Sequence, residues 1–229
     1  MTYLKTASRA ASRTASRRAQ CPTCLRAAST CICRWIAPVH AATAVLILQH
    51  PMETANAKNS ARLLHLCLPG STLVVGETFD DLAQLLDPLH DPSSRPPSAG
   101  PRRPVLLYPD TPGDRSLGIA PPPAFAPAAA QDVMLVVLDA TWRKSRKMLY
   151  LNPALQALPR LALRDVPASH YLIRKAHAPG QLSTLEATAY ALAQLENDEA
   201  RFMPLIAAFD GFVGQQQALA DAGRANPVS

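Results

Sequence analysis

The chain has 229 residues, of which 48% are hydrophobic and 17% charged, and its net charge is +6. This length is enough for one large domain with a full core plus a small appendage, and no apolar run approaches the length of a membrane span. The composition is ordinary for a soluble protein, and the positive charge is compatible with a polyanionic partner without requiring one.

The first 20 residues are rich in Arg, Ser and Ala and contain no acidic residue. Such a composition predicts a disordered basic arm, which would be either a solvated tail or a segment that contacts an RNA backbone. It is also typical of a mitochondrial transit peptide. We expect a metal-binding knuckle over residues 21–38, the main domain over residues 39–220, and a tail over residues 221–229.

Four of the five cysteines form one short C-x2-C-x6-C-x-C pattern. With no secretory signal, we expect a reducing compartment, the cytoplasm, where clustered thiols hold metal more often than they form disulfides. Two closely spaced thiolate pairs complete a closed tetrahedral site, which predicts structural zinc. The alternative is four unmodified thiols, and Cys67 is predicted to be a buried core thiol. The predicted ligands are Cys21, Cys24, Cys31 and Cys33.

Strands and helices are predicted to alternate through the rest of the chain, which favours an α/β domain with a mostly parallel sheet. The strands are expected at residues 43–49, 71–76, 105–108, 133–139 and 160–164. The helices are expected at residues 56–68, 79–86, 142–149, 183–195 and 202–219. The glycine fingerprints of dinucleotide-binding and P-loop proteins are missing from the sequence.

The most informative stretch is the apolar run at residues 133–138, which is typical of a strand buried on both faces. It ends in Asp139, and Thr141 and Trp142 follow before a basic helix. Because open α/β sheets bind ligands at the carboxyl ends of their strands, this cluster predicts a site. In the alternative interpretation, Asp139 and Thr141 only cap the helix and Trp142 packs in the core.

A second polar stretch lies at residues 171–180 and leads into a predicted helix. Ser183 and Glu186 have the S-x-x-E spacing of a capping box, so the helix start would present backbone N–H groups to a ligand. The basic residues of the stretch at residues 171–180 would then bind an anion, or else would form a solvated loop.

Together these residues resemble the DTW-domain family, whose signature corresponds to Asp139-Ala-Thr141-Trp142. The cysteine segment and the stretches at residues 50–53, 171–177 and 181–187 resemble its other motifs in the same order, and the likeness extends from Cys21 to Phe212. The family is similar to bacterial tRNA-uridine aminocarboxypropyltransferases. These enzymes move the 3-amino-3-carboxypropyl group of S-adenosylmethionine to N3 of a uridine in the tRNA variable loop. The resemblance implies a SPOUT-like fold with a knotted cofactor site, S-adenosylmethionine as donor and tRNA as partner, and we expect a monomer.

The resemblance also implies roles for individual residues. Asp139 is the candidate base for the uridine N3 proton, Trp142 would stack on the target base, and Thr141 completes the catalytic group. The predicted cofactor-binding residues are Tyr108, Leu138, Arg174, Lys175, Ser183 and Thr184. The predicted RNA-binding residues are Arg143, Lys144, Arg146, Lys147 and His177.

Two other functions are compatible with the sequence. An RNA methyltransferase of the same superfamily would share the donor and the partner but would release S-adenosylhomocysteine. A non-catalytic zinc-ribbon protein would bind RNA through the knuckle, the arm and the basic helix. The Asp139–Trp142 cluster argues against the second, because simple RNA binding needs no carboxylate in a basic groove.

Overall fold

The computed structural model describes residues 19–86, 102–109, 121–126, 128–167 and 182–225. Its centre is one five-stranded sheet in the order β2-β1-β4-β3-β5, and every strand pair is parallel. The strands are β1 Ala44–Gln49, β2 Thr72–Val75, β3 Arg103–Leu107, β4 Val133–Asp139 and β5 Arg160–Leu161. The predicted α/β fold with a mostly parallel sheet is therefore confirmed.

The helices follow the strands as expected, with shifted ends and one additional short helix, α4. They are α1 Ala61–Cys67, α2 Leu82–Leu86, α3 Trp142–Leu151, α4 Pro153–Gln156, α5 Thr184–Glu196 and α6 Glu199–Ala225. The short 3-10 helices are η1 Ala28–Thr30, η2 Cys33–Trp35, η3 Pro51–Glu53 and η6 Ala130–Asp132. The helix expected from residue 56 begins only at Ala61, because the Asn59 side chain accepts the Ala61 N–H at 2.9 Å and residues 54–58 form turns. None of the described helices is long and apolar enough to cross a bilayer.

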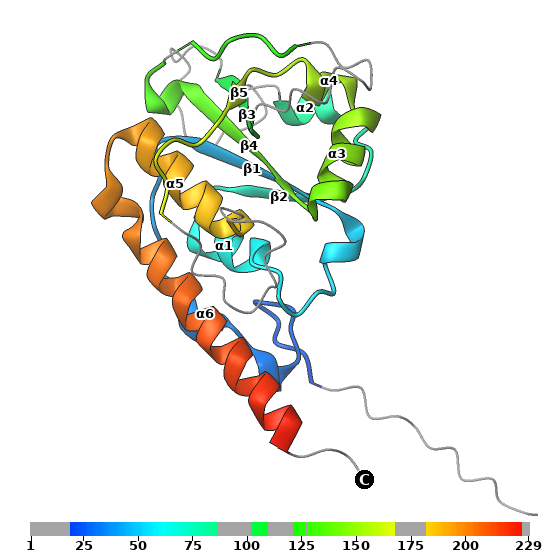
Figure 1. Cartoon of the computed structure of the whole chain (residues 1–229), viewed down its shortest axis with the longest axis vertical. Helices are drawn as coiled ribbons and strands as arrows, with labels where there is room; N and C mark the ends of the chain where they lie inside the picture. The colour runs from blue at the N-terminus through cyan, green and yellow to red at the C-terminus, as the bar shows by residue number, and fades with distance from the viewer. Residues whose placement is uncertain (1–18, 87–101, 110–120, 127, 168–181, 226–229) are drawn as a thin grey trace, which may run out of the picture.

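Side chains that alternate along the strands divide the core between the two faces of the sheet. Val45 and Ile47 of β1 pack in the cluster that contains residues of α1, α5 and α6. Leu46 and Leu48 pack in the second cluster, with residues of α2, α3 and α4. Figure 1 shows these two helical layers on opposite sides of the strands. The continuous apolar runs of the sequence follow from this double coverage.

The knuckle at residues 21–38 is joined to the long helix α6 and shares its core, as Cys24 and Ile32 lie in the same cluster as Phe212. The Trp35 indole N–H donates to Gln215 Oε1 at 2.6 Å. A β-carbon added at Gly211 would lie 2.2 Å from the Trp35 ring, so only glycine allows this close approach. Figure 1 shows the knuckle beside the C-terminal half of α6.

The connections that leave the neighbouring strands β1 and β4 run toward opposite edges of the sheet. From β1 the chain continues to β2 on one side, and from β4 it continues through α3 and α4 to β5 on the other side. The loops that follow these two neighbouring strands therefore separate and leave a crevice, the usual ligand position in open α/β sheets. Gln49 and Asp139 are register partners at the ends of β1 and β4, directly at this point.

Candidate functional site

The Asp139 carboxylate at the end of β4 is held by three donors from three different elements. Gln49 Nε2 and Asn59 Nδ2 donate to Oδ2 at 2.9 and 2.6 Å, and Thr184 Oγ1 donates to Oδ1 at 2.7 Å. Asp139 is only 3% exposed. Among the described residues, the donors come from β1, from the loop before α1 and from α5. The carboxylate is thus an oriented group at the centre of the switch point, and it does not serve as a cap for α3.

The start of α5 has the capping box predicted from the sequence. Ser183 Oγ accepts the Glu186 N–H at 3.2 Å, and Glu186 Oε2 accepts the Ser183 N–H at 2.8 Å. Thr184, the first helical residue, directs its hydroxyl to Asp139. The positive end of the helix dipole therefore faces the carboxylate of the protein itself, which is a favourable charge arrangement.

A narrow polar crevice lies beside Asp139, and a second buried carboxylate lines it. Glu53 is 3% exposed, and it accepts from Lys144 Nζ at 2.8 Å and from Asn56 Nδ2 at 3.1 Å. Charges of both signs thus line the crevice, because Lys58 also borders it. Its lining residues are Glu53, Lys58, Asn59, Ser60, Asp139, Ala140, Ser183 and Thr184.

The site also contains four residues for which the sequence predicted no role, namely Gln49, Glu53, Asn59 and Ser60. For Gln49 and Glu53 a signal was available, because polar residues directly follow the first apolar strand and Glu53 belongs to a motif of the resembled family. No comparable pattern marks Asn59 or Ser60, which reach the site through the turns that precede α1.

Trp142 begins α3 and lies on the β3 side of β4, next to Tyr108, which follows β3. Its ring stacks on Tyr108, with ring centroids 5.2 Å apart and planes 10° apart, while Trp142 stays 50% exposed. The Arg160 guanidinium lies 5.1 Å from the Tyr108 ring centroid. The interpretation of Trp142 as a core residue is therefore wrong, because half of its surface is exposed. Thr141 occupies the N-cap position of α3 as predicted, but its side chain makes no capping hydrogen bond.

Among the other predicted cofactor-binding residues, Tyr108 is buried in the stack and Leu138 packs against the core on the α3 side. Ser183 and Thr184 lie at the crevice with Asp139. Arg174, Lys175 and His177 lie outside the described residues, so their predicted roles stay predictions.

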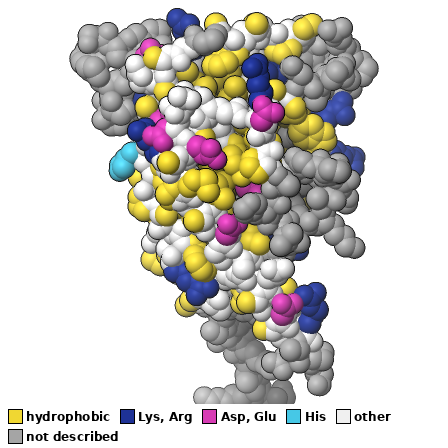
Figure 2. Space-filling model, turned by 60° about the vertical axis from the view of Figure 1, so that its left-hand side comes forward, with side chains coloured by type: hydrophobic (Ala, Val, Ile, Leu, Met, Phe, Trp, Pro, Cys, Tyr) yellow, Lys and Arg dark blue, Asp and Glu magenta, His cyan; other side chains and the backbone are white. Residues whose placement is uncertain are grey.

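Part of the charge of the basic helix α3 is compensated by acidic neighbours. Lys144 pairs with Glu53 at 2.8 Å, and Lys147 pairs with Glu77 at 3.0 Å. Hydrogen bonds from His50 and Lys147 hold the pKa of Glu77 below its ordinary value. Figure 2 brings forward the side of the molecule that carries α5 and α6, and basic and acidic side chains are interspersed there as well. Arg143 is exposed, and Arg146 is partly exposed.

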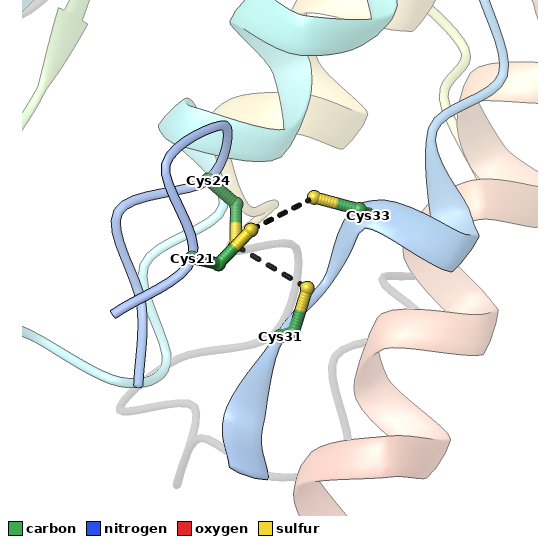
Figure 3. A group of neighbouring side chains, drawn as sticks. All are labelled: Cys21, Cys24, Cys31 and Cys33. Atoms are coloured by element: carbon green, nitrogen blue, oxygen red, sulfur yellow. Dashed lines mark hydrogen bonds between the residues drawn. The ribbon is translucent and has the colours of Figure 1, made fainter. Parts of the chain in front are cut away.

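The four predicted metal ligands converge at the knuckle (Figure 3), and their sulfur atoms all lie within 4.8 Å of one another. The Sγ atoms of Cys21 and Cys33 are 3.6 Å apart, and those of Cys24 and Cys31 are 3.7 Å apart. Tetrahedral zinc with Zn–S bonds of about 2.3 Å places its sulfur ligands about 3.8 Å apart. The donor set and its spacing therefore fit zinc.

The pKa values of two of these thiols are shifted in opposite directions. Backbone N–H groups of Cys24 and Thr23 lower the pKa of Cys21 to about 6. Burial and the neighbouring thiols raise the pKa of Cys33 to about 12. A bound divalent cation would favour the thiolate form of all four. Cys67 is separate from them, fully buried and free, as predicted.

Comparison with known proteins gives one family and a set of related enzymes. The family model of the DTW domain matches residues 18–217. A Drosophila melanogaster protein is 31% identical over 192 residues, which cover 80% of this chain and 68% of that protein. Relatives from Mus musculus and Macaca fascicularis are each 27% identical, with 80% of this chain and 59% of each relative covered. All three carry the name tRNA-uridine aminocarboxypropyltransferase 2. No solved structure matches the chain at a significant level.

Proposed function

The chain belongs to the DTW-domain family, and from this membership we propose that it transfers the 3-amino-3-carboxypropyl group of S-adenosylmethionine to N3 of a uridine in the tRNA variable loop. The observation that carries the proposal is the position of Asp139. This residue of the family signature lies at the switch point of the sheet, where three donors hold its carboxylate.

In the proposed reaction a bond forms between uridine N3 and the γ-carbon of the methionine chain. The bond between that carbon and the sulfonium sulfur breaks, and its electron pair stays on sulfur as methylthioadenosine leaves. The protein must therefore align the nucleophile with the carbon and accept the N3 proton. Methyl transfer from the same donor would instead break the bond to the methyl group and leave S-adenosylhomocysteine.

Asp139 is the proposed proton acceptor, and Thr184 provides its connection to the crevice. Both Asp139 oxygens already accept hydrogen bonds from the protein, and little of the residue is exposed. Thr184 lines the crevice and its hydroxyl donates to Oδ1, and a hydroxyl both accepts and donates. The N3 proton would pass to Thr184 as the hydroxyl proton passes to Asp139.

The remaining residues would bind and orient the two substrates. The outward face of Trp142 is available to stack on the uridine base, since Tyr108 covers its inner face. Glu53 and Lys58 offer opposite charges for the amino and carboxylate groups of the methionine chain. Arg174, Lys175 and His177 stay in the proposal as ligands for the donor carboxylate or for tRNA phosphates.

Zinc at the four cysteines would stabilise the knuckle and would take no part in the reaction, because four thiolates leave no open coordination position. The SPOUT-like knot is also part of the proposal, and a crystal structure with S-adenosylmethionine would test it. We further propose a cytoplasmic location and a monomer. Cell fractionation and analytical ultracentrifugation would test these two points.

The decisive experiment incubates the purified full-length protein with S-adenosylmethionine and tRNA from a strain that lacks it. We expect methylthioadenosine in solution and tRNA heavier by one aminocarboxypropyl group. S-adenosylhomocysteine with tRNA heavier by one methyl group would establish the methyltransferase instead. If tRNA binds but neither product forms, the enzymatic proposal is wrong and the chain is an RNA-binding module.

A further inference from the structure

We propose that Arg26, in the cysteine knuckle, is a positioning residue for Asp139. The guanidinium group of Arg26 donates from Nη1 to the Ala57 carbonyl at 2.6 Å and from Nη2 to the Asn59 carbonyl at 2.8 Å. Asn59 then donates from its side chain to Asp139 Oδ2 at 2.6 Å. The role of Asp139 in this inference rests on the proposed function, whereas the contacts themselves do not.

Asn59 is suited to transmit this position because both ends of its amide group are engaged. Its Oδ1 accepts from Gln49 Nε2 at 3.1 Å and from the Ala61 N–H at 2.9 Å, while its Nδ2 donates to Asp139. Gln49 in turn donates to the same Asp139 oxygen. A displacement of the Asn59 backbone would therefore disturb two of the three donors that orient the carboxylate.

The backbone around Asn59 depends on such outside support. It lies between η3 and α1 in a series of turns, where the Asn59 N–H donates to the Asn56 carbonyl at 2.9 Å. Because no strand or helix ladder runs through residues 54–60, the two bonds from Arg26 form a tether from a distant part of the sequence. A planar guanidinium can hold two carbonyls in a fixed geometry, and a single ammonium cannot reproduce this arrangement.

Arg26 is itself fixed by the knuckle and by α6. It lies between Cys24 and Cys31 in the sequence, and its carbonyl accepts the Cys21 N–H at 2.8 Å. Its guanidinium carbon lies 5.1 Å from the centroid of the Phe212 ring. The Arg26 side chain thereby links the cysteine segment to the Asp139 crevice.

The test compares Arg26→Lys with Arg62→Lys in the zinc-loaded full chain. Arg62 is a matched control, since its Nη2 donates to the Thr23 carbonyl at 2.7 Å and so ties α1 to the same knuckle through a bond outside residues 54–60. For Arg26→Lys we expect kcat to fall by roughly 10- to 100-fold, as for a misplaced catalytic group, with zinc content and the KM for S-adenosylmethionine nearly unchanged. Arg62→Lys should keep its kcat. Equal kcat values for Arg26→Lys and wild type would overturn the proposal.

A double-mutant cycle with Asn59→Ala separates positioning from general stability. If Arg26 acts through Asn59, the combined variant should be no slower than Asn59→Ala alone, because Asn59→Ala already removes the contact between Asn59 and Asp139. Independent, multiplying losses would mean that Arg26 acts elsewhere.

Hydrogen exchange tests the tether without any assay of activity. In Arg26→Lys, amides of residues 54–60 should exchange faster than in wild type and in Arg62→Lys. Unchanged exchange in this segment would contradict the tether even if the enzyme proves active. Faster exchange in a protein that transfers nothing would leave the tether in place and count only against the proposed function.

Discussion

The Asp139 crevice and the cysteine knuckle are both clusters of polar side chains, but they are assembled in opposite ways. The knuckle takes its four thiols from residues 21–33, so a turn at residues 22–24 and the short 3-10 helix η1 bring them together. The Asp139 cluster takes its members from β1, the α1 loop, β4 and α5, which are up to 135 residues apart, between Gln49 and Thr184. The first site depends on local spacing and the second on the register of the whole sheet, so damage to them should have different consequences.

The largest effect is expected at the centre of the crevice. Asp139→Asn should fold, because its amide nitrogen can face the Thr184 hydroxyl while its oxygen still accepts from Gln49 and Asn59. Without a proton acceptor, kcat should fall by roughly 10² to 10⁴, with S-adenosylmethionine affinity within a few-fold of wild type. Single-turnover kinetics and calorimetry would measure both quantities. Asp221→Asn, on the exposed end of α6, is the control. Loss of S-adenosylmethionine binding together with activity would show that Asp139 contacts S-adenosylmethionine.

Damage to the knuckle should affect stability first. Cys21→Ser combined with Cys24→Ser should abolish zinc binding and lower the free energy of unfolding by several kcal/mol, since metal binding at a closed site stabilises the fold. Elemental analysis and denaturant unfolding would measure this. Cys67→Ala removes a buried thiol outside the cluster and should keep one zinc per chain. Zinc retained in full by the double variant would eliminate these cysteines as ligands.

A substitution of Trp142 tests whether its stack with Tyr108 and the Asp139 crevice belong to one binding site. Trp142→Ala should raise the KM for tRNA by roughly tenfold, since stacking of one base on an aromatic ring contributes about 1–3 kcal/mol. Tyr150→Ala on the same helix, 56% exposed, is the matched control. If both variants behave alike in steady-state kinetics, Trp142 is only a surface residue.

The basic helix should show smaller effects, and they should differ from residue to residue. Arg143→Gln should reduce the slope of log affinity against log salt by about 1 if Arg143 contacts a phosphate. Lys147→Gln should change it less, because Glu77 already compensates the Lys147 charge. Filter binding of tRNA over a salt series would measure both slopes. A slope unchanged in both variants would place the RNA on another surface.

The smallest effect is a pH dependence at Glu77, whose pKa is lowered by hydrogen bonds from His50 and Lys147. A depressed carboxyl pKa stabilises the fold above the ordinary value of 4.5, and this contribution is lost as the pH falls through the lower folded-state value. Glu77→Gln should therefore be slightly less stable than wild type near neutral pH, and the difference should vanish in acid. Melting curves at several pH values would show it. A difference that stays constant with pH would contradict this assignment.

Much of the fold was predictable because its signals are local. The apolar run at residues 133–138 predicts β4, and the observed strand ends at Asp139, the first polar residue after that run. The S-x-x-E spacing predicts the start of α5, and both hydrogen bonds of the box are present. The start of α1 was misplaced, since Asn59 directs its side chain to the backbone and to Asp139, and helical spacing alone does not reveal that.

The sequence by itself determined the strands, the helices and the four-cysteine cluster, because continuous apolar runs, capping residues and short ligand spacings act within a few residues of one another. Only the tertiary structure decided which side chains meet. The order β2-β1-β4-β3-β5 makes Gln49 a neighbour of Asp139 and brings Thr184 to the same carboxylate. It also pairs Lys144 with Glu53 and leaves Trp142 half exposed on Tyr108. Such contacts depend on strand order and register, which no short pattern in the chain encodes.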